Sequence, residues 1–252
     1  MDKEKYWFKD SQITILGICI AIGMISGTWI LSKGIVAVKE FTNQVITVTG
    51  SSKQQVTSDY VIWKARFKRQ AKDLPSAFEQ IQADLQKVNT YLESKGIDPK
   101  DLFIAPVDAT SLYVRDLKGY STNEIDYYLL TQEIELRSHD IEKIDKIANS
   151  ASELIQQGLL FFVDSPRYLY TKLPELKLKL LAEATEEAKR RATTMVEASG
   201  SKLGTIRGAK MGVFQITPIN STDISDYGMN DTSSLEKNVL SVVHVTFAIN
   251  PS

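Results

Sequence analysis

The sequence predicts an α+β fold, in which a mixed or antiparallel β-sheet carries helices on one face and follows one apolar N-terminal helix. Three observations support this prediction. Apolar and polar residues alternate with period two in several segments, apolar residues recur three and four apart in three others, and an uncharged apolar run lies near the N-terminus. The predicted order after that run is β-β-α-β-β-α-β-α-β-β, which combines β-hairpins with strand–helix–strand units. Two β-α-β-β halves are an alternative division of the same elements.

The apolar run at residues 13–31 predicts a transmembrane anchor. It holds no charged residue, and roughly 19 residues at about 1.5 Å each match a hydrocarbon layer about 30 Å thick. A cleavable signal peptide is the alternative, but its apolar region is usually shorter and ends in a small-residue cleavage site. Basic residues before the run favour an N-terminus in the cytoplasm and a body outside it. The predicted division is a cytoplasmic tail at 1–12, the anchor at 13–31, a linker at 32–43 and an α+β domain at 44–250.

Strands are predicted where side chains alternate between a buried and a solvated face. Residues 60–68 are the clearest case, because Val61, Trp63, Ala65 and Phe67 alternate with polar or charged neighbours. Residues 159–163 (LLFFV) are apolar throughout and predict a buried strand. The predicted strands are 45–49, 60–68, 102–114 (an edge or bulged strand, because it holds Pro106), 127–137, 159–163, 205–216 and 239–249, with a turn at Lys118-Gly119 and a polar loop or arm at 217–236.

Three helices are predicted from their end signals and apolar stripes. The first has Asp73 as a cap, Pro75 in its first turn and Gly96 at its end. The second begins near Ser138 or Asp140 and ends at Gly158, and the third runs from Pro174 to Ser199. Their predicted buried stripes are Phe78, Ile81, Leu85, Val88 and Leu92; Ile141, Ile144, Ala148, Ala151 and Ile155; and Leu176, Leu180, Ala184, Ala188, Ala192 and Met195.

The third helix and the strand after it resemble a known family. Alanines at 182, 184, 188, 192 and 198, followed by Gly200, Leu203 and Gly204, are similar to the alanine-spaced helix and the G-x-x-L-G ending of the SIMPL domain family, also called DUF541. Residues 46–50 resemble its opening strand, and residues 77–104 resemble its first helix and the strand that follows. The resemblance covers about residues 44 to 250.

The resemblance implies a SIMPL-like α+β fold outside the cytoplasm. Bacterial relatives are periplasmic or outer-membrane-associated, some are linked to oxidative-stress defence, and one relative forms a large ring-like oligomer. The family supplies no catalytic mechanism, so the resemblance implies no active-site residue.

Composition excludes several classes of function. With 30 basic and 31 acidic residues the chain has a net charge of −1, which provides no field to attract nucleic acid. The one cysteine, Cys19, lies within the apolar run, so neither an intrachain disulfide nor thiol peroxidase chemistry is available to the body.

Candidate catalytic and metal-binding residues are few. His139 and His244 have no neighbouring cysteine or histidine to complete a zinc site, and the spacing of Asp223, Asp226 and Asp231 does not match an EF-hand loop. No P-loop, dinucleotide-binding or serine nucleophile motif occurs. The pairs Glu186–Arg190 and Glu187–Arg191 predict a charged outer helix face. We therefore predict no catalytic residue, no cofactor, no metal and no enzyme, and an unrecognised hydrolase is the minor alternative.

The function predicted from these observations is that of a membrane-anchored extracytoplasmic structural or interaction protein. Residues 13–31 hold it in the cytoplasmic (inner) membrane, and its body faces the periplasm or extracytoplasmic space. We expect its body to self-associate into a homo-oligomer larger than a dimer or to bind a protein partner. The family resemblance alone implies an indirect contribution to envelope or oxidative-stress protection. The alternative is a module that binds a small ligand or a cell-wall fragment.

Overall fold

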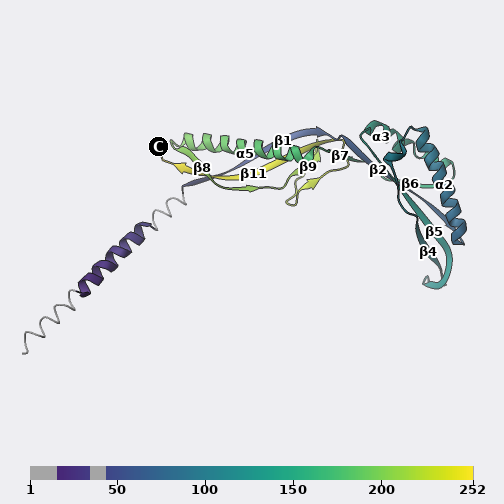
Figure 1. Ribbon diagram of the computed structural model, residues 1–252, viewed down its shortest axis with the longest axis horizontal. Helices are drawn as coiled ribbons and strands as arrows, with labels where there is room; N and C mark the ends of the chain where they lie inside the picture. The colour runs from purple at the N-terminus through teal and green to yellow at the C-terminus, as the bar shows by residue number, and fades with distance from the viewer. Residues whose placement is uncertain (1–15, 35–43, 252) are drawn as a thin grey trace, which may run out of the picture. The chain divides into compact units, whose positions relative to one another are not determined.

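The computed structural model describes residues 16–34 and 44–251 of the chain (Figure 1). The chain divides into two compact units: the described residues of unit 1 are 16–34, 44–50, 185–211 and 243–251, and unit 2 comprises residues 51–184 and 212–242. One mixed and one antiparallel β-sheet, together with helices, confirm the α+β prediction. The sequence predicted a single sheet, whereas the structure has two.

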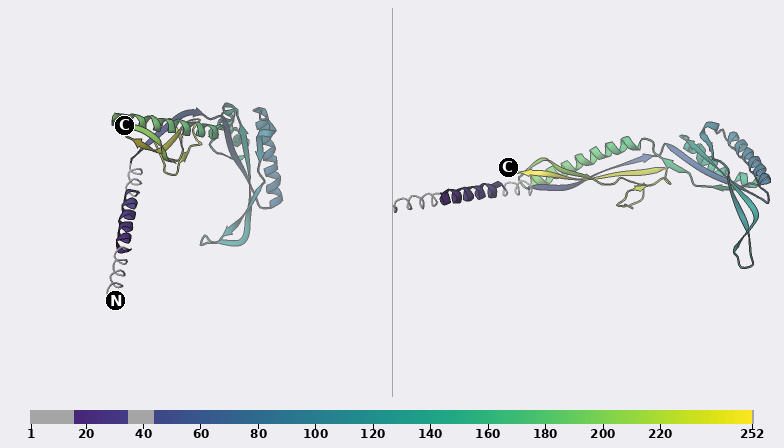
Figure 2. Two further views of the ribbon diagram at one scale, coloured as in Figure 1. Left: turned by 60° about the vertical axis from the view of Figure 1, so that its left-hand side comes forward. Right: turned by 60° about the horizontal axis from the view of Figure 1, so that its bottom comes forward.

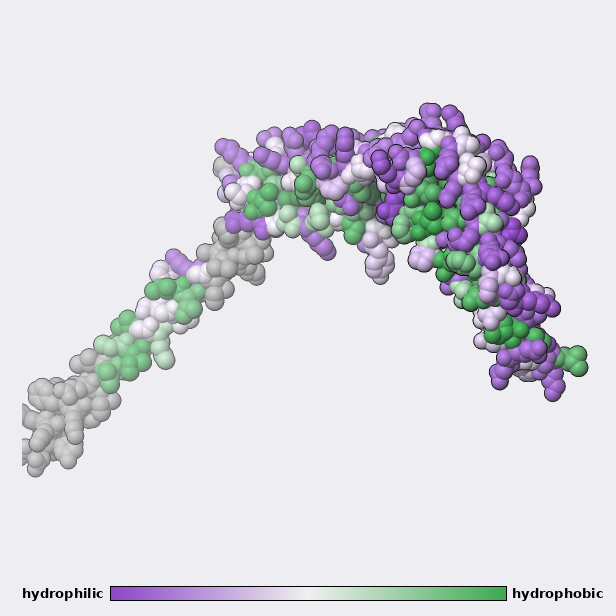
Figure 3. All heavy atoms as spheres, turned by 45° about the vertical axis from the view of Figure 1, so that its right-hand side comes forward, coloured by the Kyte–Doolittle hydropathy of each residue, from purple (hydrophilic) through white to green (hydrophobic). Residues whose placement is uncertain are grey.

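The apolar N-terminal helix spans Leu16–Gly34, and its most apolar window is not buried against any described residue. Figure 3 shows that its surface is mostly hydrophobic. The hydroxyls of Ser26 and Thr28 donate to carbonyl oxygens one turn earlier in the helix, so they need no water. The helix has the length and composition of a signal anchor or of a signal peptide. Residues 13–15 of the predicted anchor, the predicted tail and linker residues 35–43 lie outside the described residues.

The antiparallel sheet belongs to unit 2 and has the order β3-β5-β2-β6, with β4 also pairing with β5 and β7 with β2. The predicted strand at 102–114 is two strands, because the ladder with β5 breaks around Pro106. The strands are β2 (Tyr60–Ala71), β3 (Leu102–Ile104, preceded by the 3-10 turn η1, Pro99–Asp101), β4 (Asp108–Arg115), β5 (Ser121–Ser138), β6 (Leu160–Val163) and β7 (Arg167–Leu169).

Helices α2 (Leu74–Ser94), α3 (Ile141–Ser150) and α4 (Glu153–Gln156) cover one face of this sheet. The predicted start of α2 is confirmed, because the Asp73 carboxylate accepts the Ser76 N–H at 2.9 Å. Gly96, which follows α2, has a φ of 73°, a conformation that favours glycine. The second predicted helix is divided into α3 and α4 near Ala151.

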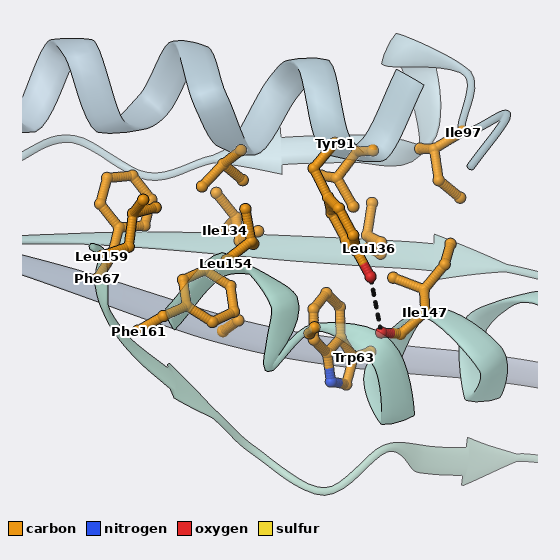
Figure 4. Close-up of a cluster of buried hydrophobic side chains, with 14 of the residues drawn as sticks. Trp63, Phe67, Tyr91, Ile97, Ile134, Leu136, Ile147, Leu154, Leu159 and Phe161 are labelled. Atoms are coloured by element: carbon orange, nitrogen blue, oxygen red, sulfur yellow. Dashed lines mark hydrogen bonds between the residues drawn. The ribbon is translucent and has the colours of Figure 1, made fainter. Parts of the chain in front are cut away.

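The core of unit 2 lies between these helices and the sheet (Figure 4). Trp63 of β2 and Leu136 of β5 are fully buried there, and the Tyr91 hydroxyl lies 2.7 Å from the Ser150 hydroxyl. Arg69 of β2 donates to Asp84 of α2 at 2.8 Å, so an ion pair also fixes the helix on the sheet. The prediction that Phe78 and Ile155 are buried is wrong, because both side chains are about half exposed. Tyr91 and Leu154 are buried in their place.

The mixed sheet has the order β1-β11-β9-β10, with β8 also pairing with β11. Only the β9–β10 pair is parallel among its described pairs. Helix α5 (Leu173–Ala198) buries all of its predicted stripe except Met195, and Val196 is buried instead. The strands are β1 (Val45–Thr57), β8 (Lys202–Met211), β9 (Gln215–Pro218), β10 (Met229–Asn230) and β11 (Glu236–Asn250); the predicted strand at 205–216 is thus divided between β8 and β9.

Candidate functional site

The outer face of the antiparallel sheet, opposite its helices, carries a ladder of ion pairs. Lys64 of β2 lies 2.7 Å from Glu133 and 3.1 Å from Glu135 of β5, and Arg137 pairs with the other oxygen of Glu135. Burial opposes ionisation of Glu135, but hydrogen bonds from Arg137 and Lys64 outweigh it and lower its pKa. Each charged side chain of this ladder is therefore paired with one of opposite charge, so the ladder offers a ligand no unpaired charge.

A cavity of about 720 Å³ adjoins one end of this ladder. Its walls come from three places in unit 2: the start of β2, the segment of η1 and β3, and the end of β5 with the turn into α3. Tyr60, Phe103 and Arg137 belong to the outer face of the sheet, because their partners in the ladders face away from the helices. The other polar lining residues are Lys100, Asp101, Ser138, His139 and Asp140.

His139, one of the two predicted candidates, lines this cavity. Its Nδ1 lies 2.7 Å from the backbone oxygen of Asp59, and its ring meets Tyr60 edge-on at a centroid distance of 4.9 Å. Because a carbonyl oxygen only accepts hydrogen bonds, Nδ1 must carry the proton. In the neutral ring, Nε2 is then an acceptor, and it has no partner among the described residues.

The distal half of the β4–β5 hairpin, residues 108–128, is a second exposed feature. Nearly all of its side chains are exposed or half-exposed, and Figure 2 shows its end standing clear of α2. At the tip, the Asp116 carboxylate accepts the N–H groups of Lys118 and Tyr120, each at 2.9 Å. Gly119 completes the predicted turn with a φ of 85°. The exposed large apolar side chains of the hairpin are Leu112, Tyr113, Leu117, Tyr120 and Ile125.

The segment 219–235, within the predicted polar arm, is held by buried polar side chains of the flanking strands. Gln215 donates to the Ser225 oxygen at 2.6 Å, and Asn238 donates to the Ile219 oxygen at 3.0 Å. Lys237 is 3% exposed and donates to the backbone oxygens of Tyr168 and Asp231. Burial lowers the pKa of Lys237, partly offset by Asp231. This segment is therefore an anchored loop.

Two acidic residues of this loop, Asp223 and Asp231, serve local turns. Asp231 Oδ1 accepts the Ser233 N–H at 2.8 Å and also binds the Ser233 hydroxyl. Burial opposes its ionisation, but these hydrogen bonds prevail and lower its pKa. Asp223 accepts the Ser221 hydroxyl at 3.0 Å. No group of three or more residues of metal-ligating type is gathered anywhere in the described ranges.

His244 and the predicted pair Glu187–Arg191 belong to unit 1 and have structural partners. His244 Nδ1 lies 2.9 Å from the Thr49 hydroxyl on the exposed face of β1 and β11. Arg191 forms the predicted ion pair with Glu187 and also donates to the Thr49 backbone oxygen at 3.1 Å. The helix charge pair therefore fastens α5 to β1 within unit 1.

Sequence reasoning did not identify the cavity. The predicted strand at 127–137 did not single out Arg137, and Phe103 and Tyr60 carried no separate signal. These residues come together because β3 pairs with β5 and β5 pairs with β2. Sequence patterns within one segment do not indicate which distant strands pair.

The fold and these sites define a two-sheet α+β domain preceded by an apolar helix. Residues 46–247 match the SIMPL family, described as a protein of unknown function (DUF541). The chain therefore belongs to the SIMPL family. No curated protein matches the sequence.

Proposed function

We propose that this chain is a membrane-anchored extracytoplasmic interaction protein that assembles into an oligomer larger than a dimer. The observation that carries the proposal is the distal half of the β4–β5 hairpin. It exposes five large apolar side chains at residues 112–125, whereas the surface of a soluble monomer rarely gathers such residues without a partner.

The hairpin also has the shape and order that binding requires. A two-stranded ribbon that no helix covers is marginally stable in water, so contact with a partner would stabilise it. The hydrogen bonds of Asp116 fix the tip before binding. A preformed tip lowers the entropic cost of association. A second copy of the chain, held on the same membrane, is the partner favoured by this proposal.

The N-terminal helix supports placement at the membrane. Leu16–Gly34 is long and apolar enough to cross a bilayer. We propose that it is retained as a signal anchor, with the body outside the cytoplasm. Mass spectrometry of the mature N-terminus tests retention, and a C-terminal reporter that is active only outside the cytoplasm tests orientation. A cleaved N-terminus, or a reporter active only in the cytosol, would contradict this placement.

The test of assembly is the mass of the purified full chain in detergent, measured by light scattering with the detergent contribution subtracted. We expect a defined species of more than two chains at micromolar concentration. A stable monomer would contradict the proposal. The matched comparison is a chain with the helix intact and the hairpin tip altered, as described in the Discussion.

A protective role in the envelope or against oxidants would be indirect. Cys19, the one cysteine of the chain, lies in the N-terminal helix, so the body has no thiol to oxidise. We propose that protection would act through assembly or binding. Deletion of the gene should then raise sensitivity to envelope stress, and unchanged sensitivity to both envelope stress and oxidants would remove this part of the proposal.

Ligand binding is the second candidate function, and the cavity of about 720 Å³ favours it. Its volume lies in the range of small-molecule sites. Ligand binding in this cavity does not involve the β4–β5 hairpin. One chain can therefore both assemble through the hairpin and bind a ligand in the cavity. We propose that this site binds its ligand and does not transform it.

A further inference from the structure

The cavity beside His139 combines aromatic surface with polar groups, and this combination indicates a class of ligand. Phe103 is 56% exposed on the short strand β3, where it gains little from burial. Tyr60 lines the same cavity and is held edge-on by His139. Two aromatic side chains in one polar concavity offer stacking surface to a ligand with an apolar face.

The polar groups of the cavity include both donors and acceptors. Arg137 uses its Nε for Glu135, which leaves its two terminal nitrogens without a partner in the described part of the chain. In the neutral ring, His139 Nε2 supplies an acceptor. Asp101 of η1 adds a carboxylate to the lining. A ligand that fits this set must donate and accept hydrogen bonds at several positions.

The charges of the lining disfavour a strongly charged ligand. Lys100 and Arg137 are basic, while Asp101 and Asp140 are acidic, and Glu135 already neutralises Arg137. An anion would meet two carboxylates, and a cation would meet two basic groups. An uncharged polar molecule meets neither penalty.

The volume of this half-open cavity gives a scale for the part of the ligand that it holds. At the roughly 30 Å³ that a water occupies in the liquid, about 720 Å³ holds about two dozen non-hydrogen atoms. A disaccharide has this size. It also has hydroxyls that donate and accept, and ring faces formed by C–H groups that pack on aromatic side chains.

We propose that the cavity lined by Tyr60, Phe103, Arg137 and His139 binds an uncharged saccharide of about two sugar rings. Phe103 and Tyr60 contact the ring faces, Arg137 donates to ring hydroxyls, and His139 Nε2 accepts from one of them. This inference rests on the second candidate function, because it names the ligand class of that cavity. It is independent of self-assembly.

The experiment uses the full chain in lipid nanodiscs, so that no sugar-based detergent competes. Saturation-transfer NMR and titration calorimetry are recorded with N,N′-diacetylchitobiose and with cellobiose. We expect saturation of ring protons in at least one of them. Phe103→Ala should weaken that binding by about tenfold. Phe162→Ala is the matched control, because Phe162 is an exposed phenylalanine of β6 that does not line the cavity.

A second variant separates contact from folding. His139→Asn keeps a side-chain N–H for the Asp59 oxygen but removes the acceptor at Nε2, so it should weaken saccharide binding without lowering the melting temperature. Binding that survives both Phe103→Ala and His139→Asn would place the sugar elsewhere and overturn the proposal.

Failure of the inference can be distinguished from failure of the candidate function. Absence of saccharide binding in a folded chain overturns the inference. If an uncharged peptide shifts the NMR signals of Phe103 and His139 while neither sugar does, the saccharide proposal is overturned and ligand binding is retained. If no probe shifts them, both are overturned.

Discussion

Two exposed segments of unit 2, the loop at 219–235 and the hairpin at 108–128, differ in how the protein holds them. The loop is polar and turn-rich in sequence, yet its backbone oxygens accept from buried Gln215, Lys237 and Asn238. The hairpin is held at its end by its own strand pairing and by Asp116. An exposed segment that is tied to the core by buried donors already has its partner within the chain.

The difference explains why the hairpin, and not the polar loop, carries the proposed assembly. Both segments expose an aliphatic and a tyrosine side chain: Ile224 and Tyr227 on the loop, Leu117 and Tyr120 on the hairpin. In the hairpin these follow further exposed apolar residues along the same ribbon. The two pairs therefore allow a direct comparison of chemically similar surfaces.

The largest effect is expected from Lys237→Met, which removes the buried anchor of the loop. The part-buried backbone oxygens of Tyr168 and Asp231 would lose a charged donor, at a cost of about 3 kcal/mol in the free energy of unfolding. Urea unfolding of the full chain in detergent measures this cost, and limited proteolysis should show new cleavage within 219–235. A stability change below about 0.5 kcal/mol would show that Lys237 does not anchor the loop.

Lowering the pH should destabilise the same loop, but by less than Lys237→Met does. Because the pKa of Asp231 is lowered in the folded chain, its stabilisation is complete above the unfolded value of about 3.9 and is lost as pH falls through the folded value. Hydrogen exchange at the N–H groups of Ser233 and Ser234 should therefore accelerate, beyond its intrinsic pH dependence, below about pH 4. Asp231→Ala should remove this step and cost about 1 kcal/mol. Exchange at these two amides that still shows the step in the variant would contradict the assignment to Asp231.

Gly119→Ala at the hairpin tip should cost about as much stability as Asp231→Ala, but the destabilisation should remain local to the tip. No atom lies within 4 Å of the added methyl group, so the penalty of about 1 kcal/mol comes only from the positive φ. Faster hydrogen exchange at residues 116–120, with little change in global unfolding, is the expected result. Equal losses in both measurements would mean that the tip unfolds together with the core.

The contrast between loop and hairpin also shows what sequence patterns can predict. Helix α2 was correctly predicted because its signals, Asp73, Pro75 and Gly96, act on their neighbours in the chain. Its buried face was less well predicted. Phe78 is exposed and Asp84 is buried because Asp84 pairs with Arg69 of another element, which no periodicity within the helix reveals.

The strand at 159–163 shows a similar limit. Its apolar run predicted burial on both faces, but only Leu159 and Phe161 are buried, while Leu160, Phe162 and Val163 are exposed. The ammonium of Lys68 lies over the Phe162 ring at 5.4 Å, so part of this apolar surface is covered by a long side chain. The cavity could not be predicted from the sequence for the same reason. Its walls come together only when β3 and β2 pair with β5.

The smallest effect on stability, and the most decisive one for function, is expected from the double variant Leu117→Ser with Tyr120→Ser. Both side chains are exposed at the tip, and the hydrogen bonds of Asp116 use only the backbone of Tyr120, so the free energy of unfolding should change by less than about 0.5 kcal/mol. Association should nevertheless be lost, because the rigid apolar tip that would enter a partner is gone. Light scattering in detergent should show a smaller species than the unaltered chain.

The matched control, Ile224→Ser with Tyr227→Ser, changes the same side-chain types on the anchored loop and should leave the oligomer intact. If the loop variant dissociates the assembly and the tip variant does not, the hairpin is not the assembly surface, and the anchored loop takes that role.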